Sequence, residues 1–319
     1  MKAVVQDRYC LPESLSLDDI DTPTPGEGEV LVRVHAAGVN IADWFIMTGK
    51  PYAVRLAYGL RRPRERVRGQ DVAGTVEAVG PGVTRFAVGD EVFGAGTGTF
   101  AEYAVARAST LVHKPAGVTF EQAGAAPMAA LVALQGLRDR GRVESGQKVL
   151  VNGASGGIGT FAVQLAVHLG AEVTGVCGPG NVELVRGLGA EVIDYSREDF
   201  TAGGEYDVVF DIAANRSLRE CRRVLSPRGR LVLAGSKGGA LTGGMDRVVG
   251  AAIQSWFSRQ WMGTWLSTPN VEDLSAVAGL LGSGVLRAVV DRRCGLGEVG
   301  SALGYVASRR ARGKVVVVP

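Results

Sequence analysis

The stretch "VNGASGGIGTFAVQLA", residues 151–166, places Gly153, Gly156, Gly157 and Gly159 in one turn. An apolar run precedes this turn and a helical pattern follows it. The spacing Gly-x-x-Gly-x-x-Gly between a strand and a helix indicates a tight turn, a backbone that a pyrophosphate can approach, and close packing of the helix on the strand. Phosphate is expected on the N–H groups that begin the helix. We therefore predict a dinucleotide in contact with Ser155, Gly156, Gly157, Ile158 and Gly159.

The strand after this helix ends in "VCGPGN", residues 176–181, which contains no acidic residue. Units that bind NAD usually hold the ribose 2′-hydroxyl with Asp or Glu at this place, and such a carboxylate repels a 2′-phosphate. The sequence therefore favours NADPH, although the turn holds no Arg or Lys and Arg186 lies further along. We expect Cys177, Gly178, Asn181 and Tyr195 near the cofactor. A partly buried aromatic at the end of the sheet is the alternative interpretation of Tyr195.

The pattern of elements changes once along the chain of 319 residues, 46% of which are apolar. Residues 1–115 show many short alternating strands separated by Gly- and Pro-rich turns, which predicts a β-barrel-like unit. From Thr119 onward, helical segments, the first of them expected over residues 119–137, alternate with nearly continuous apolar strands, which predicts a parallel sheet covered by helices. Residues 270–319 return to mixed character, with a strand expected at 286–291. Two domains are therefore expected.

Composition excludes several function classes. The net charge is +3, and six arginines, at positions 55, 61, 62, 64, 66 and 68, fall in one expected loop. Without interleaved aromatics or a basic helix this loop predicts a solvated surface and no nucleic-acid partner, while an anionic substrate stays open. The four cysteines form no Cys-x-x-Cys pair, which fits a reducing cytoplasm. Neither a signal core nor an apolar run of about 18 residues is found, so we expect no membrane span.

A resemblance covers nearly the whole chain. It is carried by "HAAGVNIADW" (35–44), "RGQDVAGTVEAVGPGVTRFAVGDEVFG" (68–94), "FAEYAVA" (100–106), "VLVNGASGGIGTFAVQLAVHLGAEV" (149–173), "GLGAEVIDY" (187–195) and "ARGKVVVV" (311–318). In this order the motifs resemble the medium-chain dehydrogenase/reductase superfamily, and within it the zinc-independent quinone oxidoreductases. The resemblance implies an α/β protein with an N-terminal GroES-like β-barrel catalytic domain and a Rossmann doubly wound parallel-sheet domain that binds the nucleotide. We place the catalytic domain at 1–118 and 267–319 and the Rossmann domain at 119–266.

The sequence predicts no metal. The related zinc enzymes need Cys in the segment where this chain has Asn40 and Asp43, and His-Glu where it has Gln70-Asp71. The three histidines, His35, His113 and His168, have no ligand partners at useful spacing. We expect His35 and His113 in strands and His168 at the end of a helix.

The resemblance places Asn40 near the nicotinamide and the acceptor, with Tyr52 on the neighbouring loop. A turn residue is the alternative interpretation of Asn40, whereas Asp43 is expected to cap a helix and Trp44 to pack in a core. Lys314 is also counted among the expected cofactor contacts. A conjugated acceptor needs no Lewis acid, because the negative charge that hydride brings is delocalised, so positioning and modest hydrogen bonding suffice. Protonation from water is expected.

The leading hypothesis is an NADPH-dependent oxidoreductase that transfers hydride to a quinone or other conjugated carbonyl compound. One alternative is an enoyl or alkenal reductase in biosynthesis, in which segment 55–68 receives an anionic carrier. An alternative of another class is an NADPH-binding regulatory protein with little turnover. The family implies a homodimer through a sheet edge of the nucleotide domain, near residues 235–253. The natural acceptor stays open.

Overall fold

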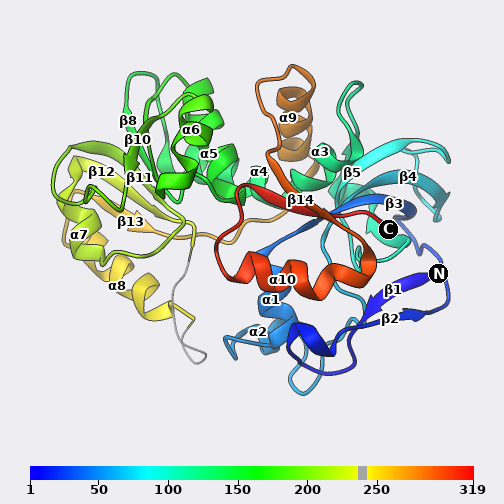
Figure 1. Cartoon of the computed structure of the whole chain (residues 1–319). Coiled ribbons are helices and arrows are strands. Elements are labelled where there is room, and N and C mark those ends of the chain that lie inside the picture. The colour runs from blue at the N-terminus through cyan, green and yellow to red at the C-terminus, as the bar shows by residue number, and fades with distance from the viewer. Residues whose placement is uncertain (236–242) are drawn as a thin grey trace. The chain divides into compact units, whose positions relative to one another are not determined.

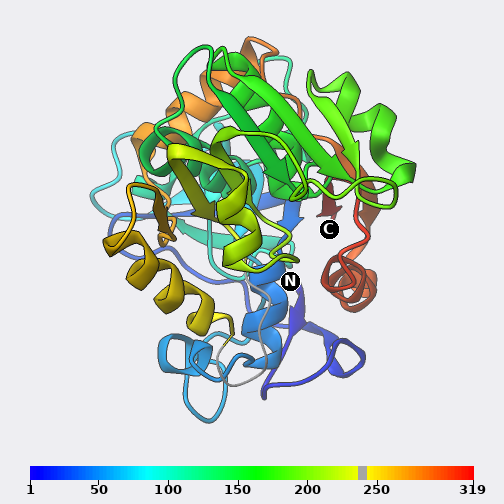
Figure 2. The same cartoon turned by 90° about the vertical axis from the view of Figure 1, so that its left-hand side faces the viewer.

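The computed structural model describes residues 1–235 and 243–319. The chain divides into two compact units (Figures 1 and 2). Unit 1 comprises Met1–Leu131 and Thr268–Pro319, and unit 2 comprises Val132–Ser267. This division into units does not test the domain limits that we proposed from the sequence, which therefore stay a prediction.

Unit 1 is built on a seven-stranded sheet in the order β14-β15-β3-β4-β5-β7, with β6 paired to β3. Its ladders are antiparallel except for the parallel pair β14–β15. A separate hairpin joins β1 to β2. The strands are β1 Lys2–Val5, β2 Ser16–Asp19, β3 Glu29–Val39, β4 Asp71–Val79, β5 Glu91–Ala95, β6 Tyr103–Arg107, β7 Leu111–His113, β14 Val290–Cys294 and β15 Lys314–Val317.

Helices pack against the sheet of unit 1 and contribute side chains to its core. They are α1 Ile41–Thr48, α2 Val54–Tyr58, α3 Phe120–Ala125, α9 Val271–Gly282 and α10 Val299–Ala307, with the 3₁₀ turns η1 Pro12–Ser14, η2 Ala108–Thr110 and η5 Leu296–Glu298. Valines of β3 and β4, Met47 of α1 and Leu303 of α10 are buried in one apolar cluster, and Trp44 packs against it as expected. This cluster holds α1 in place through Met47 and Trp44, and Asn40 is the N-cap of that helix.

Unit 2 is a six-stranded parallel sheet in the order β10-β9-β8-β11-β12-β13. The strands are β8 Lys148–Asn152, β9 Glu172–Cys177, β10 Glu191–Asp194, β11 Tyr206–Asp211, β12 Leu225–Leu233 and β13 Trp261–Gly263. The helical segments are α5 Gly157–His168, η4 Pro179–Asn181, α6 Val182–Gly187, α7 Leu218–Arg223 and α8 Met245–Trp256. The strand order reverses between β8 and β11, which is the switch point of a doubly wound dinucleotide-binding fold. The predicted fold class is confirmed.

Three local expectations need correction. The single helix expected over residues 119–137 breaks at Pro127, whose missing N–H ends α3 and starts α4 Pro127–Gln135, followed by the π-helical turn η3 Gly136–Gly141. The strand expected at 286–291 lies at Val290–Cys294, because pairing with β15 sets its register. Residues 245–263 carry no predicted element, and the structure forms α8 and β13 there.

Across the described residues, no helix combines the length and the apolar character that a transmembrane segment needs.

Candidate functional site

The glycine turn of unit 2 forms the tight connection that its spacing predicts. Gly153 has φ +94°, a conformation that favours glycine, and its N–H and that of Ala154 donate to the carbonyl of Val176 on β9. A Cβ added to Gly159 would lie 2.1 Å from the carbonyl oxygen of Gly153. Only a hydrogen at this position lets the first turn of α5 pack on the end of β8.

The same turn leaves open space on the side where a phosphate is expected. Gly156, the N-cap of α5, is extended, and a Cβ added to it would meet only the Gly153 oxygen, at 3.5 Å. A glycine offers no side chain to cap the helix, so the first N–H groups of α5 keep their capacity to bind an anion. The Gly156 N–H donates to the Gly153 carbonyl at 3.1 Å, so it is the N–H groups of Gly157, Ile158 and Gly159 that fit a pyrophosphate, with Gly156 leaving room for its approach.

The polar residues expected near the adenosine end of the cofactor come together at the edge of the sheet. Asn181 Nδ2 donates to Ser155 Oγ at 3.1 Å, while Asn181 Oδ1 is buried without a hydrogen-bond partner among the described residues. The Tyr195 backbone N–H donates to the Cys177 carbonyl, and a Cβ added to Gly178 would lie 2.9 Å from the Tyr195 hydroxyl. Tyr195 is more than half exposed. The orphaned Asn181 oxygen and the open Tyr195 ring fit a bound nucleotide.

The carboxylate of Asp194 also lies at this edge of the sheet, although the sequence of the turn after β9 gives no sign of it. Asp194 ends β10 directly opposite Cys177, and both the backbone N–H and the hydroxyl of Ser196 donate to its Oδ1. These hydrogen bonds lower the pKa of Asp194, and the exposed Arg197 lies 3.7 Å from its Oδ2. The negative charge is thus paired locally, and Arg197 adds a cation two residues after Tyr195.

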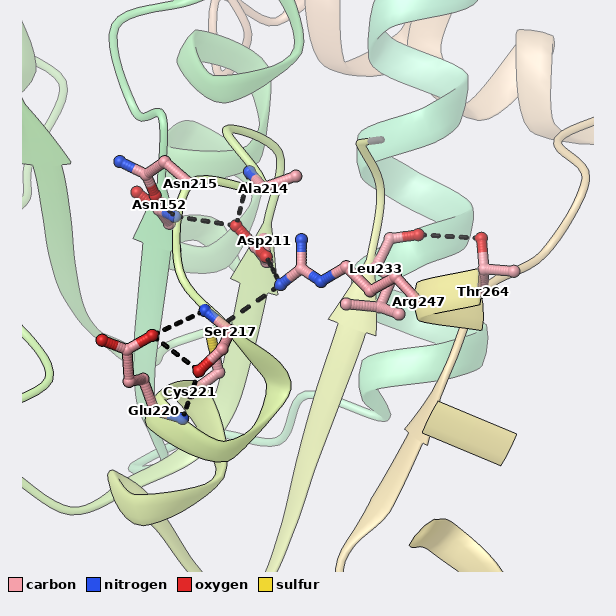
Figure 3. Close-up of polar contacts among 10 residues, drawn as sticks. All are labelled: Asn152, Asp211, Ala214, Asn215, Ser217, Glu220, Cys221, Leu233, Arg247 and Thr264. Carbon is pink, nitrogen blue, oxygen red and sulfur yellow. Dashed lines mark hydrogen bonds and ion pairs between the residues drawn. The ribbon is translucent and has the colours of Figure 1, made fainter. Parts of the chain in front are cut away.

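A buried polar network, which sequence reasoning missed, crosses the carboxyl ends of β8 and β11 (Figure 3). Asp211 is fully buried, and its Oδ1 accepts from Asn152 Nδ2 at 2.7 Å and from the Ala214 N–H at 3.0 Å. Asn152 also donates to Asn215. Arg247 of α8 pairs with Asp211 Oδ2 at 2.5 Å. The network fixes the edge of the sheet at the switch point. In the sequence, the only sign of it was an acidic residue, Asp211, at the end of the apolar strand "YDVVFD".

Asn40 of unit 1 is buried and held at both ends of its amide. Its Nδ2 donates to Asp71 Oδ2 at 2.9 Å, and its Oδ1 accepts from Lys314 Nζ. Lys314 also donates to the Val39 carbonyl at 3.2 Å and lies 3.5 Å from Asp71 Oδ2. Asp71 Oδ1 accepts from the Met128 N–H. The first residues of β4 and β15 thereby fix the side chain that begins α1.

Asp43 is not the N-cap of α1 that we expected from the sequence, but the N3 residue of its capping box. Asn40 occupies the N-cap, and Asp43 sits three residues later, where its Oδ2 accepts from the Asn40 N–H at 2.8 Å. Burial raises the pKa of Asp43 to about 7, and the charge of Asp71 adds to this effect against the opposing hydrogen bond and the cations Lys314 and Arg68. Burial likewise raises the pKa of Asp71, opposed chiefly by Lys314.

Tyr52 lies apart from this buried cluster, on the exposed turn between α1 and α2. Its ring centroid is 4.9 Å from the Arg55 guanidinium. The structure thus gathers Asn40 and Lys314 in unit 1, and gathers Ser155, Gly178, Asn181 and Tyr195 in unit 2. It adds Asp71, which the sequence marks as a lone charge opening an apolar strand. The roles of all these residues toward ligands stay predictions.

The histidines lie where the sequence predicts, with His35 in β3, His113 in β7 and His168 at the end of α5. Within residues 1–235 and 243–319, no three His, Cys, Asp or Glu side chains are grouped so as to hold a metal ion.

Comparison with known proteins gives two domain matches. Residues 26–116 match the alcohol dehydrogenase GroES-like domain, and residues 188–317 match a domain described as zinc-binding dehydrogenase. A quinone oxidoreductase of Pseudomonas aeruginosa is 35% identical over 326 residues, covering 98% of this chain and 97% of the relative.

Solved structures of similar proteins cover the whole chain. The quinone oxidoreductase from Coxiella burnetii aligns with TM-score 0.88 and 29% identity, over 100% of this chain and 99% of the other. Escherichia coli quinone oxidoreductase complexed with NADPH aligns with TM-score 0.85 and 26% identity, over 100% of both chains. The CurK enoyl reductase aligns with TM-score 0.85 and 25% identity, over 99% and 98%.

The raised pKa of Asp43 predicts a pH-dependent stability. The folded chain binds this proton more tightly than the unfolded chain, in which an Asp titrates near pH 3.9, so the free energy of unfolding should fall as pH rises from about 4 to about 7. The loss attributable to Asp43 is at most about 4 kcal/mol. Asp43→Asn keeps an oxygen for the Asn40 N–H and removes this loss.

Urea unfolding of both proteins across this pH range measures the effect. Asp71, Lys314 and Arg68, which face Asp43, are present in both proteins. The stability of the variant relative to wild type should increase with pH, and Asp18→Asn on β2 is the control for removing a carboxylate elsewhere in unit 1. A difference that stays constant from pH 4 to pH 7 would contradict the assignment.

Proposed function

We propose that this chain transfers hydride from NADPH to a quinone or another conjugated carbonyl compound. The premise is that the chain belongs to the zinc-independent quinone oxidoreductases of the medium-chain dehydrogenase/reductase superfamily. The observation that carries the proposal is the glycine turn, whose open N-cap and orphaned helix N–H groups fit a dinucleotide. The likeness to a quinone oxidoreductase over almost the full length supports the acceptor class.

Residues of unit 2 bind the cofactor in this proposal. The N–H groups at Gly157, Ile158 and Gly159 hold the pyrophosphate, and Asn181 offers the ribose its Oδ1, which has no hydrogen-bond partner among the described residues. Bound NADPH supplies the hydride. The protein contributes the position of the nucleotide and a sheet edge stiffened by the Asp211 network.

The preference for NADPH rests on charge at the ribose end. Residues 178–182 after β9 contain no acid, and Oδ1 of Asp194 at the neighbouring strand end accepts both hydrogen bonds of Ser196. Tyr195 and Arg197 present an aromatic ring and a cation at the same edge, which suits a 2′-phosphate better than a free hydroxyl. The similar E. coli enzyme was solved in complex with NADPH.

Asn40 is proposed to orient the acceptor. Asp71 takes one amide hydrogen of Asn40 and Lys314 occupies its oxygen, while among the described residues the second amide hydrogen has only the Gly38 carbonyl, at 3.5 Å. A carbonyl oxygen of the acceptor offers this hydrogen a better acceptor as negative charge develops on it. Tyr52 is the proposed neighbour on the loop, Lys314 is the proposed link to the cofactor, and water supplies the final proton.

A second candidate is the reduction of an enoyl thioester or alkenal. The likeness to the CurK enoyl reductase favours it, because that chain is covered almost completely. Both reactions add hydride to a double bond conjugated with a carbonyl group. Steady-state NADPH oxidation by one purified sample, measured with quinones, enals and enoyl thioesters, separates the two candidates. The proposed function requires kcat/KM to be highest with a quinone, and higher with NADPH than with NADH.

We further propose a homodimer that acts in the cytoplasm. β13 forms one edge of the unit 2 sheet, and α8 packs beside it. Met245, Val249, Ile253, Trp256 and Phe257 recur at helical spacing and are exposed, Trp256 and Phe257 by 89% and 86%. An open sheet edge beside an apolar helix face suits pairing with a second copy. Of the segment expected at this interface, residues 236–242 lie outside the described residues.

Asn40→Ala is the variant that tests the acceptor site. Loss of a hydrogen bond that strengthens as charge develops should lower kcat/KM with a simple quinone about a hundredfold, equivalent to about 3 kcal/mol, at unchanged NADPH affinity. Turnover, NADPH Kd and melting temperature are measured together. Thr48→Ala is the control, since its hydroxyl donates only within α1. Normal turnover with a lowered melting temperature would make Asn40 a structural residue.

The dimer proposal is tested by sedimentation velocity. The wild type should sediment at about twice the 33.3 kDa mass of one chain. Val249→Arg with Ile253→Arg places two charges on the exposed face of α8 and should yield the monomer without loss of folding, whereas Leu17→Arg on exposed β2 should leave the dimer intact. A monomeric wild type would refute the proposal.

A further inference from the structure

The arginine-rich segment between α1 and β4, residues 49–70, is pinned to the body of unit 1. The guanidinium of Arg55 lies 4.5 Å from the ring centroid of Tyr9 and 4.9 Å from that of Tyr52, and its Nε donates to the Gly49 carbonyl at 3.0 Å. The Tyr9 hydroxyl donates to the Gly59 carbonyl. These contacts fix α2, which Figure 1 shows beyond α1, away from the β3–β4 sheet.

Backbone contacts close the turn that follows α2. The Gly59 N–H donates to the Arg55 carbonyl at 2.9 Å, and the Arg64 N–H donates to the Tyr58 carbonyl at 2.8 Å. Gly59 has φ +120°, and a Cβ added there would lie 2.1 Å from the Arg62 carbonyl oxygen. Pro63 is buried. Residues 60–62 therefore form a folded tip, whose side chains are presented without further ordering of the chain.

The tip and the helix before it expose apolar and cationic side chains together. Leu56 and Leu60 are exposed by 72% and 67%. Arg61, Arg62 and Arg64 are exposed, and their side chains make no hydrogen bond or ion pair with any described residue. Arg66 differs, because it pairs with Asp7 at 2.6 Å. Segment 49–70 contains seven cations and a single acid, Glu65.

We propose that this docking tip, formed by Leu56, Leu60, Arg61, Arg62 and Arg64, binds the surface of a membrane that contains anionic lipids. Arginines attract anionic headgroups, while leucines enter the boundary between headgroups and acyl chains. The long arginine stems can follow the leucines inward and keep their charges at the phosphates. The tip thus binds as a peripheral element, without crossing the bilayer.

The combination of side chains favours a lipid surface over other anionic partners. A small soluble phosphate compound would use the arginines but leave both leucines in water. A folded acidic protein would need roughly 800 Å² on each partner for a stable interface, far more than five projecting side chains provide. A bilayer requires only a shallow, preformed protrusion.

One consequence rests on the proposed function. Apolar quinones dissolve in the bilayer, and a tip anchored in the headgroup layer keeps unit 1, which carries Asn40, at the surface where such an acceptor is presented.

Cosedimentation of the full chain with lipid vesicles tests the proposal. The wild type should bind phosphatidylcholine vesicles that contain phosphatidylglycerol, bind pure phosphatidylcholine much more weakly, and be released at about 1 M salt, where the screening length falls to about 3 Å. Arg61→Gln, Arg62→Gln and Arg64→Gln combined should lower the partition coefficient about a hundredfold, at about fivefold for each arginine. Leu56→Ser with Leu60→Ser should also weaken binding.

The matched control neutralises three exposed arginines of unit 2, with Arg186→Gln, Arg223→Gln and Arg228→Gln. Absence of wild-type binding to anionic vesicles would overturn the proposal, as would equal losses in the tip and control variants. Retained binding of the leucine variant would reduce the tip to a nonspecific electrostatic contact and also overturn it. Turnover with a water-soluble quinone should be unchanged in the tip variants, so failure of the proposed function would appear in that assay and not in vesicle binding.

Discussion

The close contact between the first turn of α5 and the end of β8 is the constraint on which unit 2 depends. With no Cβ at Gly159, the helix reaches the Gly153 carbonyl, and its N-terminus then lies at the carboxyl edge of the parallel sheet. Two consequences follow from this position. The orphaned N–H groups of α5 face the switch point between β8 and β11, and the Asp211 network can stiffen that edge from the other side. The glycines thus serve packing and ligand approach at once.

A buried charge cluster plays the corresponding part in unit 1. The Lys314–Asp71 pair joins the first residues of two strands far apart in sequence, and both side chains converge on the Asn40 amide. A buried ion pair of this kind contributes little net stability, because the cost of removing both charges from water offsets their attraction. Separating the two partners would leave an uncompensated buried charge, so the pair keeps both side chains in place. Asp43, which accepts a hydrogen bond from the Asn40 N–H, has a raised pKa because it is fully buried and a second carboxylate, that of Asp71, is near. The cluster therefore holds one amide in a single orientation at the start of α1.

Much of this arrangement is predictable from sequence because it depends on local chemistry. The glycine spacing locates the α5 turn, and alternation of helices and apolar strands predicts the parallel sheet, which the structure confirms. Contacts between distant segments are not predictable in this way. Nothing local pairs Asp211 with Arg247, or Lys314 with Asp71, since these partners meet only after the sheets form. Asp43 was expected to cap α1 because Asp often does so, but Asn40 three residues earlier takes the cap and leaves Asp43 to accept its N–H. The helix α8 was missed although its apolar residues Met245, Val249 and Ile253 recur at helical spacing.

Titration of NADPH into a Gly156→Asp variant tests the central claim most directly. Gly156 is extended, an added Cβ would meet only one atom at 3.5 Å, and Asp is a favoured N-cap, so the variant should fold with an unchanged or raised melting temperature. Its carboxylate would occupy the N–H groups of α5 and repel the pyrophosphate. Gly187→Asp, where no atom lies within 4 Å, is the control for the added charge. The account predicts that NADPH affinity falls at least about a hundredfold in Gly156→Asp alone, equivalent to about 2.7 kcal/mol. Unchanged affinity in a folded Gly156→Asp variant would contradict it.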